Sequence, residues 1–340
     1  MEKLQDRAML VRLSVSQWTA RKKDKRASKH VAEHYGADQD AVATHKALVA
    51  KRNLEEIQKI AGEMRTYHYD HTVEMAGMPG YAILTNAMFP EYMAKSSELA
   101  NSFRSAVAKF LHEYPALRDA AVAKASLGGL YDEGDYPSES DMARKFKLGV
   151  DFTPIPEGNH LSINISEDDL AEIQASIEAR VRDAEQAAMA ELWQRVYDVT
   201  AAMAERMTDK NGEAKGFHDS LIGNIQKLAE LLPKLNVSGD PNLDMISKEL
   251  VQDLGRYNPG ELRRNEHLRK EAKGKADSIL ARVTAAMGGT AGAGEELPEA
   301  PEIIVHPVAE IEPSDIKGLG EPEPGGDDDM LAKLRKAGIL

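Results

Sequence analysis

Apolar residues recur at helical spacing along most of this 340-residue chain, and most clearly between residues 166 and 207. The apolar positions there follow one another in steps of three or four residues: Leu170, Ile173, Ile177, Val181, Ala184, Ala188, Leu192, Val196, Val199, Met203 and Met207. Such a stripe predicts one nearly straight helix, about 60 Å long, that packs along a partner helix. Ser166 and Asp169 have the spacing of a capping box and predict where this helix begins.

The same spacing predicts six further helices. They cover about residues 38–67, 90–126, 138–147, 217–232, 240–255 and 258–288. Asp240-Pro241 and Asn258-Pro259 each place a capping residue before a proline at the first helical position, which predicts two of the helix starts. In the first of these helices the apolar stripe is read through Val42, His45, Val49, Ile57, Ile60 and Met64.

Extended segments are fewer. Residues 10–18 alternate enough between apolar and polar to predict a short strand, and residues 160–165 are compatible with a second one. Pro154 and Pro156 predict an extended crossover, because proline restricts both itself and the residue before it.

The predicted fold is therefore all-α: an elongated bundle of long antiparallel helices with a short extended crossover and a disordered acidic C-terminal tail. Its predicted parts are an N-terminal arm with a basic run (1–37), a helical region (38–130), an irregular crossover (131–165), a long-helix bundle (166–288), a disordered acidic linker (289–326) and a short amphipathic tail peptide (327–340).

The tail holds much of the charge. The chain has a net charge of −13, and twelve acidic but only four basic residues lie from Gly289 onward. The linker is rich in Gly, Pro and Glu, which predicts disorder. The last residues, "DDDMLAKLRKAGIL", could fold into a helix that docks on a partner, with an apolar side formed by Met330, Leu331, Leu334, Ile339 and Leu340. The alternative is a frayed tail that its charges keep soluble.

Composition excludes some chemistry. The chain has no cysteine, which rules out disulfides, thiolate nucleophiles and cysteine-based zinc sites, and which agrees with a reducing compartment. The first residues lack the apolar stretch of a signal peptide, and no apolar run reaches the roughly 20 residues of a membrane span. We expect a cytoplasmic protein without membrane contact. We also find no Walker loop, dinucleotide-binding turn or nucleophile elbow, so the sequence predicts no catalytic residue and no cofactor.

Two short stretches could hold a metal ion. "YHYDHTVEM" brings His68, Asp70, His71 and Glu74 within one helix end, and zinc accepts two histidines with a carboxylate. The helix stripe, continued in the same steps, instead places the histidines on the packed face, and we favour that structural interpretation. "HVAEH", residues 30–34, matches the H-x-x-E-H signature of inverted zinc peptidases. It adjoins a basic run and Gly36, a context typical of a solvated arm, so a metal-dependent hydrolase is the remote alternative.

The basic run itself is a candidate for phosphate contact. It consists of Arg21, Lys22, Lys23, Lys25, Arg26 and Lys29. Concentrated positive charge of this kind can bind a nucleic acid. For a single run in an acidic protein, a solubilising loop is the favoured interpretation.

Three blocks resemble a known family: "FPEYMAKSSELANSFRSAVAKFLHEYPAL", "LGGLYDEGDYPSESDMARKFKLGVDFTPIPEG" and "FHDSLIGNIQKLAELLPKLNVSGDPNLDMI". They are similar to the bacterial and phage proteins grouped as domain-of-unknown-function family 3150, and the likeness extends from about residue 10 to 288. The resemblance implies a phage or mobile-element origin and, because some members lie near genes for MoxR-type AAA+ ATPases, an adaptor or client role. It carries no catalytic residues, and His30 and His34 are not part of its pattern.

We therefore expect a non-enzymatic helical interaction protein, an adaptor or scaffold from a bacterial cell or phage-infected host, with an AAA+ ATPase as a candidate protein partner. The alternative is a nucleic-acid-associated protein that uses residues 21–29. The sequence leaves the oligomeric state open.

Overall fold

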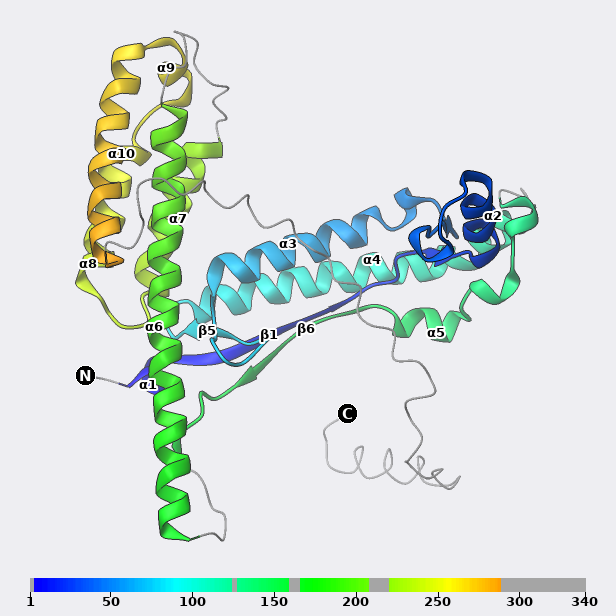
Figure 1. Ribbon diagram of the computed structural model, residues 1–340, viewed down its shortest axis with the longest axis horizontal. Helices are drawn as coiled ribbons and strands as arrows, with labels where there is room; N and C mark the ends of the chain where they lie inside the picture. The colour runs from blue at the N-terminus through cyan, green and yellow to red at the C-terminus, as the bar shows by residue number, and fades with distance from the viewer. Residues whose placement is uncertain (1–2, 124–126, 159–165, 208–219, 289–340) are drawn as a thin grey trace. The chain divides into compact units, whose positions relative to one another are not determined.

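The computed structural model describes residues 3–123, 127–158, 166–207 and 220–288 (Figure 1). The expected strand at 160–165, the acidic linker and the tail peptide with Met330, Leu331, Leu334, Ile339 and Leu340 lie outside the described residues. The described chain is mostly helical but contains a small antiparallel sheet, so the all-α prediction holds only roughly.

The elements follow one another in a mixed order. The strands are β1 (Ala8–Ser16), β2 (Arg21–Lys23), β3 (His45–Ala47), β4 (Val73–Glu74), β5 (Ala82–Thr85) and β6 (Lys147–Thr153). The helices are α1 (Leu4–Arg7), α2 (Lys25–Tyr35), α3 (Glu55–His71), α4 (Phe89–Ala123), α5 (Glu139–Arg144), α6 (Glu167–Arg206), α7 (Ser220–Leu235), α8 (Pro241–Glu249), α9 (Pro259–Arg264) and α10 (Glu266–Ala286). A π-helical turn, Leu250–Gly255, follows α8 directly.

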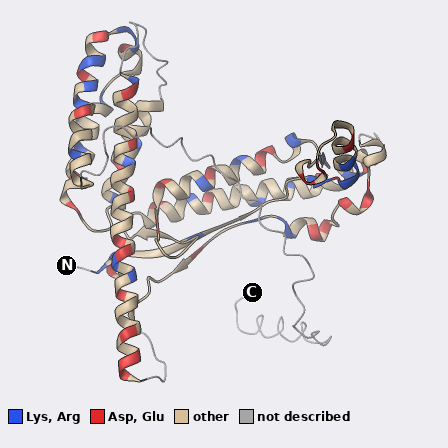
Figure 2. Cartoon of the chain, in the orientation of Figure 1, with Lys and Arg blue, Asp and Glu red and all other residues tan. Residues whose placement is uncertain are grey.

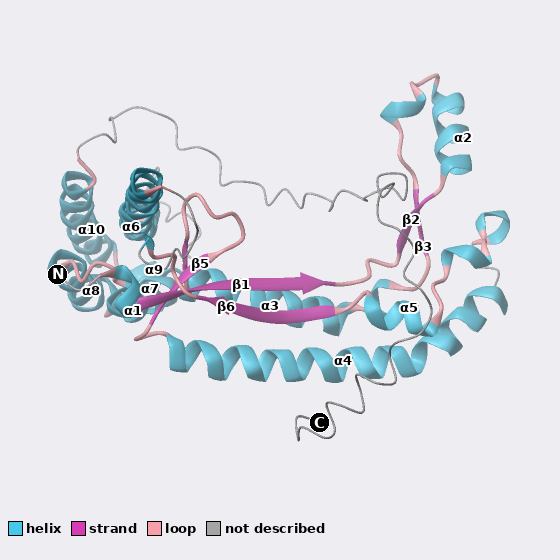
Figure 3. Cartoon of the chain, turned by 90° about the horizontal axis from the view of Figure 1, so that it is seen from below, coloured by secondary structure: helices cyan, strands magenta, loops and turns pink. Residues whose placement is uncertain are grey.

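The larger sheet has the order β4-β5-β1-β6, with every pair antiparallel (Figure 3). β1 is therefore an inner strand. It pairs Leu10 with Ile83 on one side and with Thr153 on the other, and the Leu10 side chain is fully buried. The sequence indicates β1 through its alternation. β5 is only four residues long and buried throughout, so it shows no period that could have predicted it.

Two hydrophobic clusters hold the described chain together. One is built from the sheet, the C-terminal half of α6 and helices α7, α8 and α10. The other lies between α3, α4 and α5 around Trp18, Phe103, Phe110, Tyr114 and Met142. Pro115 lies inside α4 without ending it, as the predicted helix over 90–126 requires.

The long helix α6 begins where the sequence predicts. The Ser166 hydroxyl accepts a hydrogen bond from the Asp169 amide at 3.2 Å, and the helix continues for 40 residues. From Val181 onward its apolar stripe is buried against α10 and α7, except for the half-buried Val199.

Three predicted helices differ from the structure. The helix over 138–147 ends at Arg144, because Lys147 begins β6, which pairs with β1. The helix over 38–67 is wrong in its first half, because residues 45–47 form β3 and the helix begins only at Glu55. β3 pairs with β2 across more than twenty residues of sequence, and this partner overrides the apparent helical spacing of Val42 and Val49. The helix over 258–288 is interrupted at Asn265, which caps α10 from Glu266 onward because its side chain accepts a hydrogen bond from the Leu268 amide at 3.2 Å.

Candidate functional site

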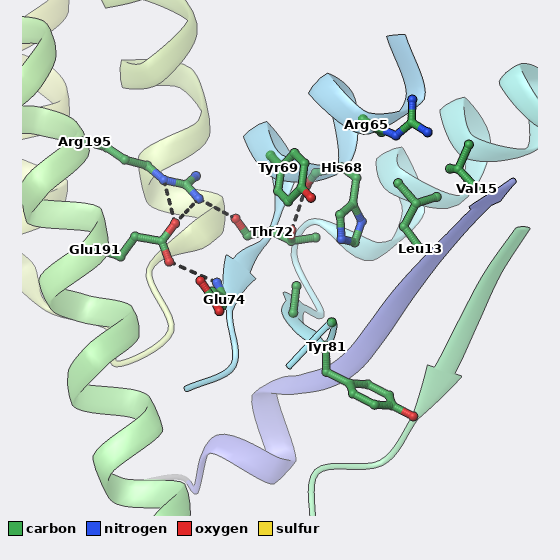
Figure 4. A pocket seen from close by; sticks show the side chains of 12 residues that line it. Leu13, Val15, Arg65, His68, Tyr69, Thr72, Glu74, Tyr81, Glu191 and Arg195 are labelled. Carbon is green, nitrogen blue, oxygen red and sulfur yellow. Dashed lines mark hydrogen bonds and ion pairs between the residues drawn. The ribbon is translucent and has the colours of Figure 1, made fainter. Parts of the chain in front are cut away.

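A cavity of about 390 Å³ lies where β1, the end of α3, β4, β5 and the middle of α6 meet (Figure 4). Its lining residues are Leu13, Val15, Arg65, His68, Tyr69, Thr72, Glu74, Gly80, Tyr81, Ala82, Glu191 and Arg195. Several residues of "YHYDHTVEM" line this cavity, so a metal ion bound by that stretch would lie here.

The side of the cavity formed by α6 is held by an ion pair. Arg195 contacts Glu191 one turn earlier and donates a hydrogen bond to the Thr72 carbonyl at 2.8 Å. Glu191 in turn accepts a hydrogen bond from the backbone amide of Glu74 at 3.0 Å. The contacts with Thr72 and Glu74 attach the start and end of β4 to α6, and together with the ion pair they occupy the guanidinium of Arg195 and the carboxylate of Glu191 (Figure 4).

His68 reaches the cavity from a buried position. Its side chain is 5% exposed, and Nδ1 lies 2.7 Å from the hydroxyl of Tyr92, which is itself fully buried. Burial lowers the pKa of His68 to about 4 and raises the pKa of Tyr92, because the charged form of each is poorly solvated. His68 is therefore neutral near pH 7.

His71 and Asp70 do not line the cavity. His71 is buried, lies with Nδ1 2.7 Å from the Tyr67 carbonyl and stacks on the Tyr67 ring. A carbonyl can only accept, so Nδ1 carries the proton. Asp70 forms an ion pair with Lys227 at 2.5 Å.

The burial of His68 and His71 confirms the prediction that both histidines lie on the packed face of the helix. In the part of the chain that the structure describes, no three His, Asp or Glu side chains come together as a metal site would need. The second candidate, "HVAEH", lies on α2, where His30, Glu33 and His34 are exposed and Glu33 pairs with Lys29 at 3.7 Å.

The basic run is folded, unlike a solubilising loop. Arg21, Lys22 and Lys23 form β2, and Lys25, Arg26 and Lys29 lie on α2; all six side chains are exposed. We call β2, α2 and β3, together with residues 128–136, the basic lobe.

A buried lysine fixes the basic lobe. Lys46 of β3 lies with Nζ 3.3 Å from Asp24, 2.5 Å from Asp135 and 2.7 Å from the Leu130 carbonyl. Burial acts to lower the pKa of Lys46, but the two carboxylates outweigh it and the pKa is raised. Asp24 also caps α2 by accepting a hydrogen bond from the Ala27 amide at 2.9 Å, which helps to lower its own pKa.

The sequence does not indicate that Lys46, Asp24 and Asp135 lie together. The first two are about twenty residues apart and the third is almost ninety further on, so no local spacing joins them. Only the acid within the basic run, Asp24, gives a signal, since a single acid before a helical stretch is typical of an N-cap.

Compared with known proteins, the chain matches no family model, no curated protein and no solved structure. Within the described ranges, every helix is too short or too polar to cross a membrane.

Proposed function

We propose that this protein is a non-enzymatic adaptor or scaffold that docks a helical segment of a partner protein on the N-terminal half of α6. The observation that supports this most directly is an apolar stripe that the described residues leave partly exposed. Within α6, all of which the structure describes, no residue before Val181 is buried. Yet Leu170, Ile173 and Ile177 continue the same stripe, and Ile173 is 38% exposed.

The spacing of these side chains fits one kind of occupant. Positions three and four apart on a helix form a ridge, and an amphipathic partner helix packs such ridges into its own grooves. α10 and α7 already pack against the C-terminal half of the same stripe.

The charges around the stripe indicate the chemistry of the partner. Glu167, Asp168 and Asp169 occupy the first turn of α6, and Glu172 and Glu178 follow beside the stripe. Figure 2 shows the acidic residues gathered on these first turns. A partner helix with an apolar stripe flanked by Lys and Arg complements this surface.

The resemblance to domain-of-unknown-function family 3150 suggests which partner to test. We propose a MoxR-type AAA+ ATPase of the same bacterial or phage genome, met in the cytoplasm. In this proposal the long helices serve as an elongated scaffold, and the tail peptide 327–340 is a second, tethered contact that would raise the effective concentration of the first.

The test measures binding of the purified ATPase by isothermal titration calorimetry. Ile173→Glu places a charge in the stripe and should weaken binding at least tenfold. Ala175→Glu adds the same charge on the opposite side of the same helix, where it should change binding less than twofold. Equal affinity of both variants and the unmodified protein would show that the stripe is not the docking surface.

A further inference from the structure

Residues 21–29 of the basic lobe concentrate positive charge. Residues 21–32 contain six bases and one acid in a chain whose net charge is −13. That acid, Asp24, is buried and bound by Lys46 and the Ala27 amide. It therefore offers little attraction to the bases around it.

The exposed bases of the lobe have almost no partners. Among the described residues, no side chain forms a hydrogen bond or an ion pair with Arg21, Lys22, Lys23, Lys25 or Arg26. The sixth base, Lys29, pairs with Glu33, but both are about 60% exposed, and a surface pair of this kind is weak. The lobe also has exposed acids, Glu33 on α2 and Asp132 and Glu133 in residues 128–136, whereas Asp38 and Asp40 follow α2 in a separate 3₁₀ turn.

The backbone of the lobe presents these bases in a fixed arrangement. In β2, Arg21 and Lys23 point to the same face, about 7 Å apart along the strand. The register places Lys22 opposite Lys46, whose buried amine is held by two carboxylates. Because this anchor joins β3 to the start of α2 and to residues 130–135, the backbone that carries the bases has little conformational entropy left to lose when they engage a ligand.

Two further features point to the kind of ligand. Arg26 and His30 line an open groove of about 380 Å³ that runs against Gly129 and Leu130. At the end of the same helix, the Tyr35 ring is 77% exposed and lies beside His34 at 4.9 Å. Phosphates are bound by clustered Lys and Arg, and an exposed aromatic ring offers a surface on which a base can stack.

From this arrangement we infer that the basic lobe binds the sugar–phosphate backbone of a nucleic acid, with Tyr35 favouring a single strand. This inference does not depend on the docking surface of α6. An adaptor with both surfaces would bring a partner protein to a nucleic acid.

The experiment uses the full chain and a labelled 30-nucleotide strand of mixed sequence, with binding followed by fluorescence anisotropy at 50 and 200 mM salt. We expect binding that weakens steeply with salt, because each neutralised phosphate releases counterions. The variant R21A/K23A/R26A should bind at least tenfold more weakly at 50 mM salt. The slope of log affinity against log salt should become shallower by about two, since each single-strand contact contributes about 0.7.

The matched control is K248A/R264A/K270A, which removes the same charge from exposed positions on α8, α9 and α10. It should bind as the unmodified protein does, and circular dichroism should show both variants folded. Tyr35→Ala should weaken binding of the single strand more than that of a duplex of the same sequence.

Three results would overturn the inference: no salt-dependent binding by the unmodified chain, an equal loss in both triple variants, or binding to vesicles with anionic lipids in place of the nucleic acid. None of them bears on Ile173, so a failure here leaves the test of the adaptor proposal intact.

Discussion

The two halves of α6 carry the same apolar spacing but meet different surroundings. From Val181 onward the stripe is buried against α7 and α10 except at half-buried Val199, and Val196 is fully buried. Before Val181, Leu170, Ile173 and Ile177 remain half-buried or exposed. In Figure 1 this first half extends beyond the helices that cover the second. Periodicity therefore shows which face of a helix is apolar, whereas only the fold shows whether that face is already covered.

The sharpest contrast between the halves comes from the same substitution in each. Val196→Asp places a charge in a fully buried position and should lower the free energy of unfolding by about 4 kcal/mol. Ile173→Asp should lower it by no more than about 0.5 kcal/mol, because the side chain stays in contact with water. Urea unfolding followed by circular dichroism measures both.

Gln194→Asp serves as the control in the packed half, because the Gln194 side chain is exposed two residues before buried Val196. It should lower the free energy of unfolding by less than about 1 kcal/mol, through the loss of an exposed hydrogen bond to Asp198 and a like charge one turn away. Equal losses at Ile173 and Val196 would mean that the first half of α6 is covered as well, and the adaptor proposal would lose its surface.

The stability of the protein should also depend on pH, through His68 of α3, which lines the same cavity as the packed half of α6. His68 has a pKa of about 4 in the folded protein, below the ordinary value of 6.5, so the unfolded chain binds more protons between these values. The free energy of unfolding should therefore fall as the pH drops from about 6.5 toward 4, by up to about 3 kcal/mol from this group.

Unfolding of His68→Gln across the same pH range measures this contribution. The variant should show a shallower dependence, whereas Ile173→Asp should keep the full slope. A slope unchanged in His68→Gln would show that other groups, such as the carboxylates, cause the effect.

The smallest expected effect concerns the start of α6. Ser166→Ala removes the side chain that accepts the Asp169 amide, a cap of about 1 kcal/mol. Because the first half buries little, we expect the loss to appear locally: amides of residues 167–178 should exchange with solvent about fivefold faster. The free energy of global unfolding should hardly change.

Asp240→Ala is the matched change at a packed helix, since Asp240 caps α8 by accepting the Asn242 amide at 2.9 Å. For Asp240→Ala, the loss of about 1 kcal/mol should appear in the free energy of global unfolding. If Ser166→Ala destabilises the whole protein as much as Asp240→Ala does, the first half of α6 unfolds together with the rest.

Local signals in the sequence predicted local structure well. The sequence places three helix caps correctly, at Ser166, Asp240 and Asn258, because each cap depends on a few neighbouring residues. It also predicts α4 to within a few residues at either end. The stripe continued through α3 also predicted the burial of His68 and His71.

Features that depend on distant partners could not be predicted in this way. Local spacing predicts a helix at residues 45–47 because it carries no sign of their partner strand, β2. The anchor of the basic lobe joins Lys46 to Asp135 across almost ninety residues. Local spacing does not show this anchor either, so the sequence alone favours a solvated loop for the basic run.

The position of β1 inside the sheet has a consequence for how the protein is made. β1 meets β5 early in synthesis, but its other partner, β6, follows about 130 residues later, a delay on the order of ten seconds at ribosomal rates. During that time one edge of an apolar strand has no native partner, and such an edge pairs readily with strands of other chains. Chains that end before Lys147 should therefore aggregate, and the interval before β6 leaves the ribosome is when the nascent protein most needs a chaperone.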